Sequence, residues 1–267
     1  MMGDTAKYIY CIIGCPDSRF FDCTAIGATG NPVYTVCQRS IAAVVSDSNV
    51  NRYDNNRKNM IAHEKVQESV MHQFTVLPVR FGTVSDSSTP VQELQKLLSY
   101  RYDEFTDLLN KMDGKVELGI KAFWRDAPAI FSEILEGDPY LRRMRDSLAG
   151  KPPEATHFDR IRLGEMIKEA LEKKRGKEAA KMIAVLSDLA VDTRENDTLS
   201  DKMVMNAAFL VDKKKEHEFD RAVSQLDEQF SHRLLFKYVG HDTPPYNFVN
   251  LVINWNEIRE GEASVRR

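Results

Sequence analysis

The chain has 267 residues, of which 42% are hydrophobic and 29% are charged, and its formal net charge is -3. This composition predicts a folded protein with a buried core, long enough for one large domain or two ordinary ones. The slightly acidic balance argues against nucleic-acid binding, which usually requires a basic surface. The longest apolar run, Tyr8–Ile13, is far shorter than the roughly 20 residues of a membrane-spanning helix, and no signal peptide is expected.

The first half of the chain is predicted to contain both strands and helices. Aromatic and β-branched runs bounded by turn residues indicate strands, whereas apolar residues at helical spacing indicate helices. In chain order we expect a strand at Lys7–Ile13, a hairpin of Val33–Cys37 and Ile41–Ser46, a loop at Asp47–Asn56 that caps the next helix, a helix at Arg57–Phe74, a strand at Val76–Phe81, and one helix from Thr89 to about Met112.

The second half begins with a clearly alternating strand, Lys115–Trp124. One of its faces is apolar, while Glu117 and Lys121 should lie on the opposite face, toward water or a neighbour. After it we expect helices at Ala127–Leu135 and Tyr140–Leu148, a long helix at Asp159–Leu189, strands at Val191–Asp197 and Met203–Val211, a helix at Lys213–Ser231, and a strand at Leu234–Val239.

The order of these elements defines the predicted fold class, which is α+β with two domains. Residues 1–113 should form an N-terminal mixed α+β domain. From residue 114 the order is strand, helix, strand, strand, helix, strand, which is typical of a ferredoxin-like domain. Residues 114–267 should therefore form a modified ferredoxin-like domain with a helical insert and a C-terminal tail.

The four cysteines all lie within the first 37 residues, at positions 11, 15, 23 and 37. Their spacing matches no common zinc site or disulfide framework. We expect reduced thiols that pack as small hydrophobic side chains, with a metal site or a disulfide as the alternative.

The helix at Arg57–Phe74 carries the one arrangement that suggests a metal site. His63-Glu64 starts a zinc-protease motif, but Gln67 stands where the second histidine is needed. Glu64, Glu68 and His72 share one face of the helix and could hold a divalent ion. A solvated or hydrogen-bonded face is commoner, so neither a metal ion nor a cofactor is expected.

Arg80-Phe81-Gly82 ends the predicted strand with a basic residue, an aromatic residue and a glycine that permits a left-handed or tight turn. Arg80 could bind an external phosphate or carboxylate. We favour instead a structural pair with Glu64 or Glu68 of the preceding helix, because arginine at a strand end commonly anchors packing.

Pro244-Pro245-Tyr246-Asn247-Phe248-Val249 is an extended, aromatic segment near the end of the chain. Its prolines exclude a helix, so the segment should lie along a surface. We favour a strap packed on its own domain over a surface that binds a partner, although aromatic residues are enriched at interfaces.

Several strings together resemble the GvpF/GvpL family of gas vesicle proteins. The most specific is Leu77-Pro-Val-Arg-Phe-Gly-Thr83. The others are Tyr8–Tyr10, Ala42–Ser46, Ala62–Glu64 with Glu68, Gly114–Leu118 with Trp124, and Tyr238–Gly240 followed by Pro-Pro-Tyr. The resemblance covers most of the chain and implies a two-domain α+β structure with a ferredoxin-like second domain.

The resemblance also implies a function without catalytic residues. It implies an accessory or minor structural protein, located at gas vesicles in the cytoplasm, that binds the small hydrophobic shell protein (GvpA type) and other accessory gas vesicle proteins. It would limit aggregation of the shell protein and remain on the gas-facing side of the shell. Nucleic acid and lipid membranes are not expected partners. The candidate structural or contact residues are His63, Glu64, Glu68, Arg80, Phe81, Gly82, Trp124, Pro244, Pro245, Tyr246 and Phe248.

Two other classes of function remain open. One is an enzyme or regulator that binds a small molecule or a metal through His63, Glu68 and Arg80 on a ferredoxin-like scaffold. The other is an RNA-binding module that stacks bases on sheet aromatics, for which Met203–Val211 offers only Phe209.

Overall fold

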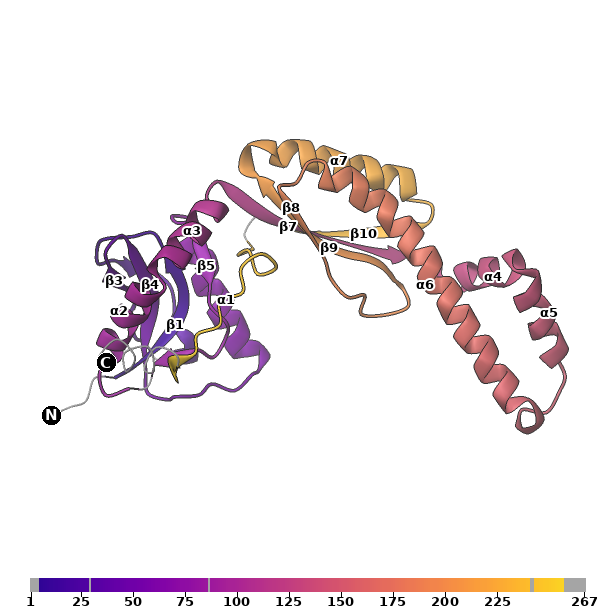
Figure 1. The fold of residues 1–267 in the computed structure, drawn as a ribbon, viewed down its shortest axis with the longest axis horizontal. Helices are drawn as coiled ribbons and strands as arrows, with labels where there is room; N and C mark the ends of the chain where they lie inside the picture. Colours follow the sequence, from indigo (N-terminus) through magenta and orange to yellow (C-terminus); the bar gives the residue numbers. More distant parts are fainter. Residues whose placement is uncertain (1–4, 29, 86, 241–242, 257–267) are drawn as a thin grey trace, which may run out of the picture. The chain divides into compact units, whose positions relative to one another are not determined.

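The computed structural model describes residues 5–28, 30–85, 87–240 and 243–256. It is a mixed α+β protein with two β-sheets, as Figure 1 shows. The chain divides into two compact units, one formed by Met1–Glu117 with Gly240–Arg267 and the other by Leu118–Val239. None of the helices in the described residues is both long enough and apolar enough to cross a membrane.

The sheet of the first unit is organised around β1 (Ala6–Ile13), as its apolar sequence predicts. The strand order is β2-β3-β4-β1-β5, and β6 also pairs with β1. The other strands are β2 (Phe20–Phe21), β3 (Val33–Gln38), β4 (Ile41–Ser48), β5 (Val76–Pro78) and β6 (Val84–Ser85), with a short 3-10 turn at Ile26–Ala28. The predicted hairpin is confirmed, and Arg39 at its tip adopts a left-handed φ of 54°.

A β-bulge interrupts the alternation of β1. The pairing with β4 shifts between Ile9 and Cys11, so Tyr10 is the extra residue. As a result Tyr10 and Cys11 both join the core cluster on the side of the sheet where Val66 lies. The carbonyl of Tyr10 accepts a hydrogen bond from the Val79 amide at 3.0 Å, which extends the β1–β5 register by one pair beyond Cys11 and Pro78.

Helices cover both faces of this sheet (Figure 1). One face is covered by α1 (Arg57–Met71), whose first turn is capped by the Asn56 side chain as the polar loop predicts. On the other face lie α2 (Pro90–Tyr100) and α3 (Tyr102–Met112). Because both faces are covered, nearly every side chain of β1 is buried.

The single helix predicted from Thr89 to Met112 is wrong, because Arg101 leaves the helical conformation and separates α2 from α3. The Arg101 side chain makes several contacts at this break. Its guanidinium lies over the Phe105 ring and pairs with Glu104, both within one helical turn, and donates to the Val252 carbonyl at 2.9 Å. The bond to Val252 is the long-range contact among these.

The strand predicted at Val76–Phe81 is shorter than expected. It ends at Pro78, and the chain then turns at Gly82, whose φ of 83° confirms the predicted left-handed turn. The turn returns the chain to β1 as β6.

The second unit contains a four-stranded sheet with the order β10-β7-β9-β8. Helices α6 and α7 both contact β9 and each other. The elements are β7 (Lys115–Trp124), α6 (His157–Ser187), β8 (Asp192–Glu195), β9 (Met203–Asp212), the 3-10 turn Lys213–Lys215, α7 (Glu216–Phe230) and β10 (Leu234–Val239). The predicted apolar face of β7 is confirmed, since Val116, Leu118, Ile120, Ala122 and Trp124 are all buried.

Of the two predicted environments for Glu117, water or a neighbour, the structure shows a neighbour, the C-terminal tail. Glu117 is only 5% exposed, and its carboxylate accepts hydrogen bonds from the backbone and the side-chain nitrogen of Asn247. Sequence alternation places Glu117 on the correct face, but it does not reveal that the C-terminal tail covers that face.

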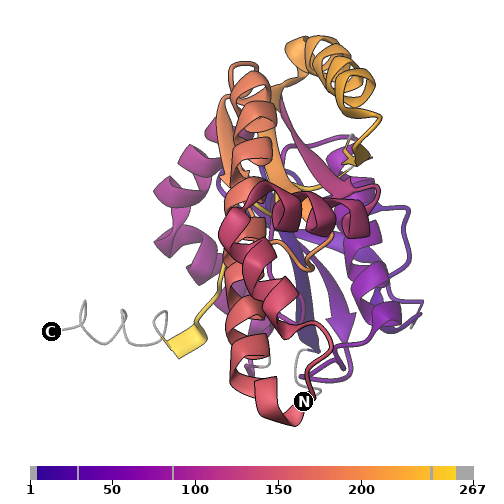
Figure 2. The same cartoon turned by 90° about the vertical axis from the view of Figure 1, so that its right-hand side faces the viewer.

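Three helices form an extension of the second unit. In Figure 2, α4 (Ala127–Gly137) and α5 (Pro139–Leu148) lie against α6, and the 3-10 turn Glu154–Thr156 precedes α6. Glu133 of α4 fixes this packing by accepting from Lys174 at 2.7 Å and from Arg233 at 2.8 Å. The predicted helical insert is therefore present, and each of its helices is slightly longer than expected.

The described tail residues, 243–256, group with the first unit, whereas the sequence analysis assigned them to the second domain. Leu251 forms a parallel bridge with Val79, and the Trp255 indole donates to the Val84 carbonyl at 2.9 Å. The tail thus covers the open edge beside β5. Residues 257–267 of the predicted tail lie outside the described residues.

Gly114, which links α3 to β7, provides a test of the backbone geometry. Its φ is +66°, and a Cβ added there would meet no atom within 4 Å. Gly114→Ala should therefore lower the free energy of unfolding by about 1–2 kcal/mol through backbone strain alone. Gly176→Ala, in the interior of α6, is the control and should raise it by up to about 1 kcal/mol. Urea unfolding measures both, and equal effects would contradict the left-handed assignment.

Candidate functional site

A buried polar network lies between β1 and α1 and uses both ring nitrogens of His63. The Tyr8 hydroxyl lies 3.0 Å from Nδ1, and the Val79 carbonyl lies 3.1 Å from Nε2. The side-chain nitrogen of Gln67 also lies 2.9 Å from Nε2, so both ring nitrogens are engaged whichever of them carries the proton. The Tyr8 oxygen in turn accepts from the Gly82 amide at 3.0 Å. His63 therefore connects α1 to β1 and to the Gly82 turn.

The environment of His63 keeps it neutral. Its side chain is 4% exposed, and burial lowers its pKa from 6.5 to about 4. Burial also raises the pKa of Tyr8, so neither group is charged near neutral pH. With both ring nitrogens engaged, His63 has no lone pair for a metal ion or for proton transfer.

Gln67, one turn further along α1, connects this network to the tail. Its side-chain nitrogen donates to the Tyr10 carbonyl at 2.6 Å, which also accepts from the Val79 amide. Its side-chain oxygen accepts from the Tyr246 hydroxyl. In the sequence, Gln67 serves only to exclude a zinc motif, and its structural role is not predicted. The signal was a polar residue on the apolar face of a helix, beside Val66 and Val70.

The tail closes a pocket of about 240 Å³ over this network. Tyr246, Val249 and Leu251 line it from the tail, opposite His63 and the Pro78–Phe81 segment. Pro244 is buried, and Pro245 and Phe248 are half-buried. The favoured interpretation of the proline-rich segment as a strap on its own unit agrees with these contacts, although Tyr246 remains 39% exposed.

Arg80 does not form the predicted structural pair. Among the described residues no ion pair joins it to Glu64 or Glu68, and its side chain is exposed at the pocket wall. The two carboxylates also face different depressions, since Glu64 lines the tail pocket and Glu68 lines a second one. Burial and the neighbouring Glu68 raise the pKa of Glu64. The bonds of His63 already fix α1 against the strand, so this pairing is not needed for packing.

The second depression lies between α1 and the loop 22–27 and has a volume of about 570 Å³. Glu68, His72 and Cys23 all line it, together with Lys58 and Lys65. Within the part of the chain that the structure describes, no three His, Cys, Asp or Glu side chains are placed to hold a metal ion. The four cysteines are free thiols, and burial raises the pKa of Cys11.

Two of the predicted functional residues belong to the second unit. Trp124 is 4% exposed and lies under the Arg233 guanidinium, 5.1 Å from the ring centre, so its role is in packing. Phe209 is fully buried, so it cannot stack on an RNA base. The one aromatic side chain that favoured the RNA-binding hypothesis is therefore unavailable.

Most of the chain is similar to gas vesicle proteins. The family model described as "Gas vesicle synthesis protein GvpL/GvpF" matches residues 6–250. Gas vesicle protein F of Microcystis aeruginosa is 31% identical, covering 85% of this chain and 91% of that protein. The protein of the same name from Dolichospermum flosaquae is 30% identical, covering 84% and 90%. The crystal structure of GvpF from Anabaena sp. PCC7120 superposes with a TM-score of 0.77 at 28% identity, covering 94% of this chain and all of that one.

The buried His63 should make stability depend on pH. Its folded pKa of about 4 lies below the unfolded value of 6.5, so the unfolded state binds a proton first as the pH falls. The free energy of unfolding should therefore fall by about 3 kcal/mol between pH 6.5 and pH 4 on account of this residue. His63→Gln should flatten that slope in urea titrations, while His72→Gln, at an exposed position, should retain it. Parallel slopes in all three proteins would contradict the assignment.

The Glu117–Asn247 contact should hold the tail on the first unit. Asn247→Ala removes one of the two donors to a buried carboxylate, which should cost about 1–3 kcal/mol of tail docking. Proteolysis and hydrogen exchange of residues 243–256 should both accelerate. Asn250→Ala, at an exposed position in the same tail, is the matched control and should leave both rates unchanged. Unchanged rates in Asn247→Ala would show that the tail is held elsewhere.

Proposed function

This chain belongs to the GvpL/GvpF family of gas vesicle synthesis proteins, and on that premise we propose that it binds the small hydrophobic shell protein during gas vesicle assembly. By covering apolar surface of the shell protein before assembly, it limits aggregation of that protein. It acts within the cytoplasm, works with other accessory gas vesicle proteins, and stays on the gas-facing side of the finished shell. This role requires binding surface and no catalysis.

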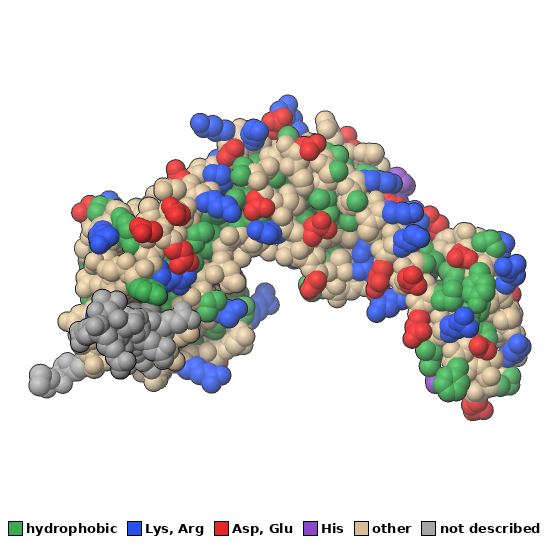
Figure 3. All heavy atoms as spheres, viewed as in Figure 1, with side chains coloured by type: hydrophobic (Ala, Val, Ile, Leu, Met, Phe, Trp, Pro, Cys, Tyr) green, Lys and Arg blue, Asp and Glu red, His purple; other side chains and the backbone are tan. Residues whose placement is uncertain are grey.

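One observation carries the proposal: large apolar side chains are exposed on the second unit. Phe158, in the first turn of α6, is 84% exposed, Leu199 is 78% exposed and Val239 is 50% exposed. Figure 3 shows hydrophobic side chains at the surface of the α4–α6 region, interspersed with charged ones. Apolar surface rimmed by charges is typical of a protein-binding surface. The first unit also exposes single large side chains, Phe20 and Tyr100, but its sheet is covered on both faces.

We also propose that the second unit is a modified ferredoxin-like domain. The strand order β10-β7-β9-β8 supports this, as does the succession of a strand, helices, two strands, a helix and a strand. Helices α4 and α5 are then an insert in the first crossover. The domain boundary lies near the beginning of β7, and the tail returns to the N-terminal domain.

Co-expression with the shell protein tests the proposed function. A tagged form of this chain should co-purify with the shell protein from one cytosol and increase the fraction of shell protein in the supernatant. Cross-links should cluster on the second unit. Phe158→Ser should reduce capture several-fold without loss of stability, because the side chain is exposed. Tyr100→Ser, which removes a 66% exposed aromatic from the first unit, is the matched control. A folded, monodisperse protein that captures no shell protein would refute the proposal.

A further inference from the structure

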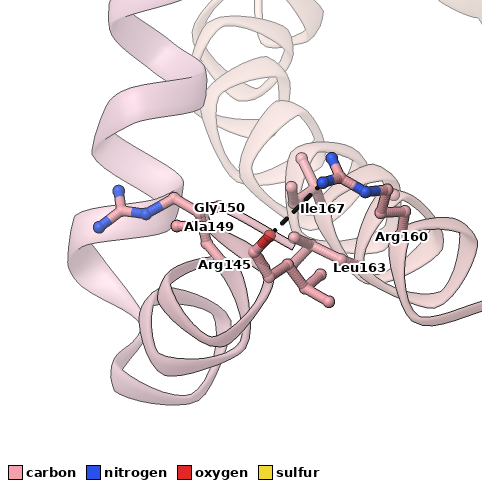
Figure 4. Close-up of a pocket in the computed structure, with 8 residues that line it drawn as sticks. Arg145, Ala149, Gly150, Arg160, Leu163 and Ile167 are labelled. Atoms are coloured by element: carbon pink, nitrogen blue, oxygen red, sulfur yellow. Dashed lines mark hydrogen bonds between the residues drawn. The ribbon is translucent and has the colours of Figure 1, made fainter. Parts of the chain in front are cut away.

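A hollow opens between the C-terminal end of α5 and the N-terminal half of α6. Its volume is about 420 Å³, enough to admit a bulky apolar side chain. The lining combines apolar side chains with residues that have little or no side chain (Figure 4). Leu148, Leu163 and Ile167 supply apolar surface, and Ala149, Gly150 and Gly164 leave the space between them.

Gly164 leaves the hollow open because it has no side chain, and it lowers the stability of α6. It lies inside the 31-residue α6, where glycine is less favourable than alanine or leucine. A Cβ at this position would meet no atom within 4 Å, so packing does not require glycine here. A larger side chain would enter the hollow and strengthen α6. The feature is therefore compatible with a role other than stability.

The charge at the rim of the hollow is not balanced. The Arg160 guanidinium donates to Thr156 Oγ1 at 2.9 Å and to the carbonyls of Leu148 and Lys151 at 3.4 Å each. No carboxylate of the described residues forms an ion pair with it. Arg145 differs, because it points away from the hollow in Figure 4 and pairs with Glu136 and Asp146. The rim at Arg160 thus presents a cation that a carboxylate would complement.

We infer that this hollow is the docking site for a helix of the shell protein, which inserts one apolar side chain and pairs a carboxylate with Arg160. Side chains three or four residues apart on a helix are about 5–6 Å apart, which suits an apolar anchor beside an acidic neighbour. Insertion of such an anchor into a groove between helices is a common mode of recognition. The inference rests on the proposed function and specifies the surface and the chemistry of the contact.

Filling the hollow provides the test. Gly164→Leu should raise the melting temperature by about 2–4 °C and lower capture of the co-expressed shell protein at least tenfold. Gly176→Leu is the matched control, because Gly176 lies in the same helix, its Cβ would also meet open space, and it does not line the hollow. It should raise the melting temperature similarly and capture the shell protein as the wild type does. A more stable protein that no longer binds cannot be explained by misfolding.

A variant that removes the Arg160 charge tests the proposed ion pair. Arg160→Gln should lower capture and make the remaining capture less sensitive to salt, because an ion pair is lost. Arg162→Gln removes an exposed charge from the same helix outside the hollow, and it should leave both properties unchanged.

The possible failures can be distinguished. If the wild type captures the shell protein and Gly164→Leu captures it equally, the docking site is refuted and the proposed function stands. If the wild type captures no shell protein, both are refuted. If the wild type instead self-associates and Gly164→Leu becomes monomeric, the occupant is a second copy of this chain, and docking of the shell protein is refuted.

Discussion

The first unit depends on a single backbone carbonyl, that of Tyr10. It accepts from the Val79 amide, in continuation of the β1–β5 register, and from the Gln67 side chain. Val79 begins the segment that leads to the Gly82 turn, and Gln67 also accepts from Tyr246 of the tail. One backbone carbonyl of a central strand therefore connects a helix, a turn and the tail.

Because these groups are buried, each donor and acceptor of the network needs a hydrogen-bond partner if the fold is to remain stable. An unpaired buried donor or acceptor is expensive, whereas a fully paired network specifies one arrangement. His63 satisfies this condition with both ring nitrogens bonded, and it remains neutral. His63, which most suggests a catalytic site in the sequence, thus has a structural role. Arg80 lies at the wall of the same pocket with its charge exposed, since the helix is already held by His63.

Sequence periodicity predicts an element of this fold well where residues close together in the chain determine its conformation. The apolar stripe of β7, the hairpin at Arg39, the Asn56 cap and the left-handed Gly82 follow from local chemistry. It fails where distant segments intervene. The α2–α3 break occurs at Arg101, whose side chain bonds the Val252 carbonyl of the tail, and Glu117 is covered by Asn247, 130 residues away. The candidate pocket could be predicted in its parts, but the hydroxyls of Tyr8 and Tyr246 that connect it could not.

The two units differ in how completely their apolar and polar groups are covered. In the first, both faces of the sheet, the exposed edge and the buried polar groups are covered, which favours one rigid arrangement. In the second, the α4–α6 region retains an exposed Phe158, an interior Gly164 and an Arg160 without a carboxylate partner in the described residues. The exposed Phe158 lowers the solubility of the isolated chain and the interior Gly164 lowers the stability of α6, whereas Arg160 leaves a cation at the surface. The ion pairs of Glu133 with Lys174 and Arg233 hold α4 against α6, which presents this region as a pre-organised surface.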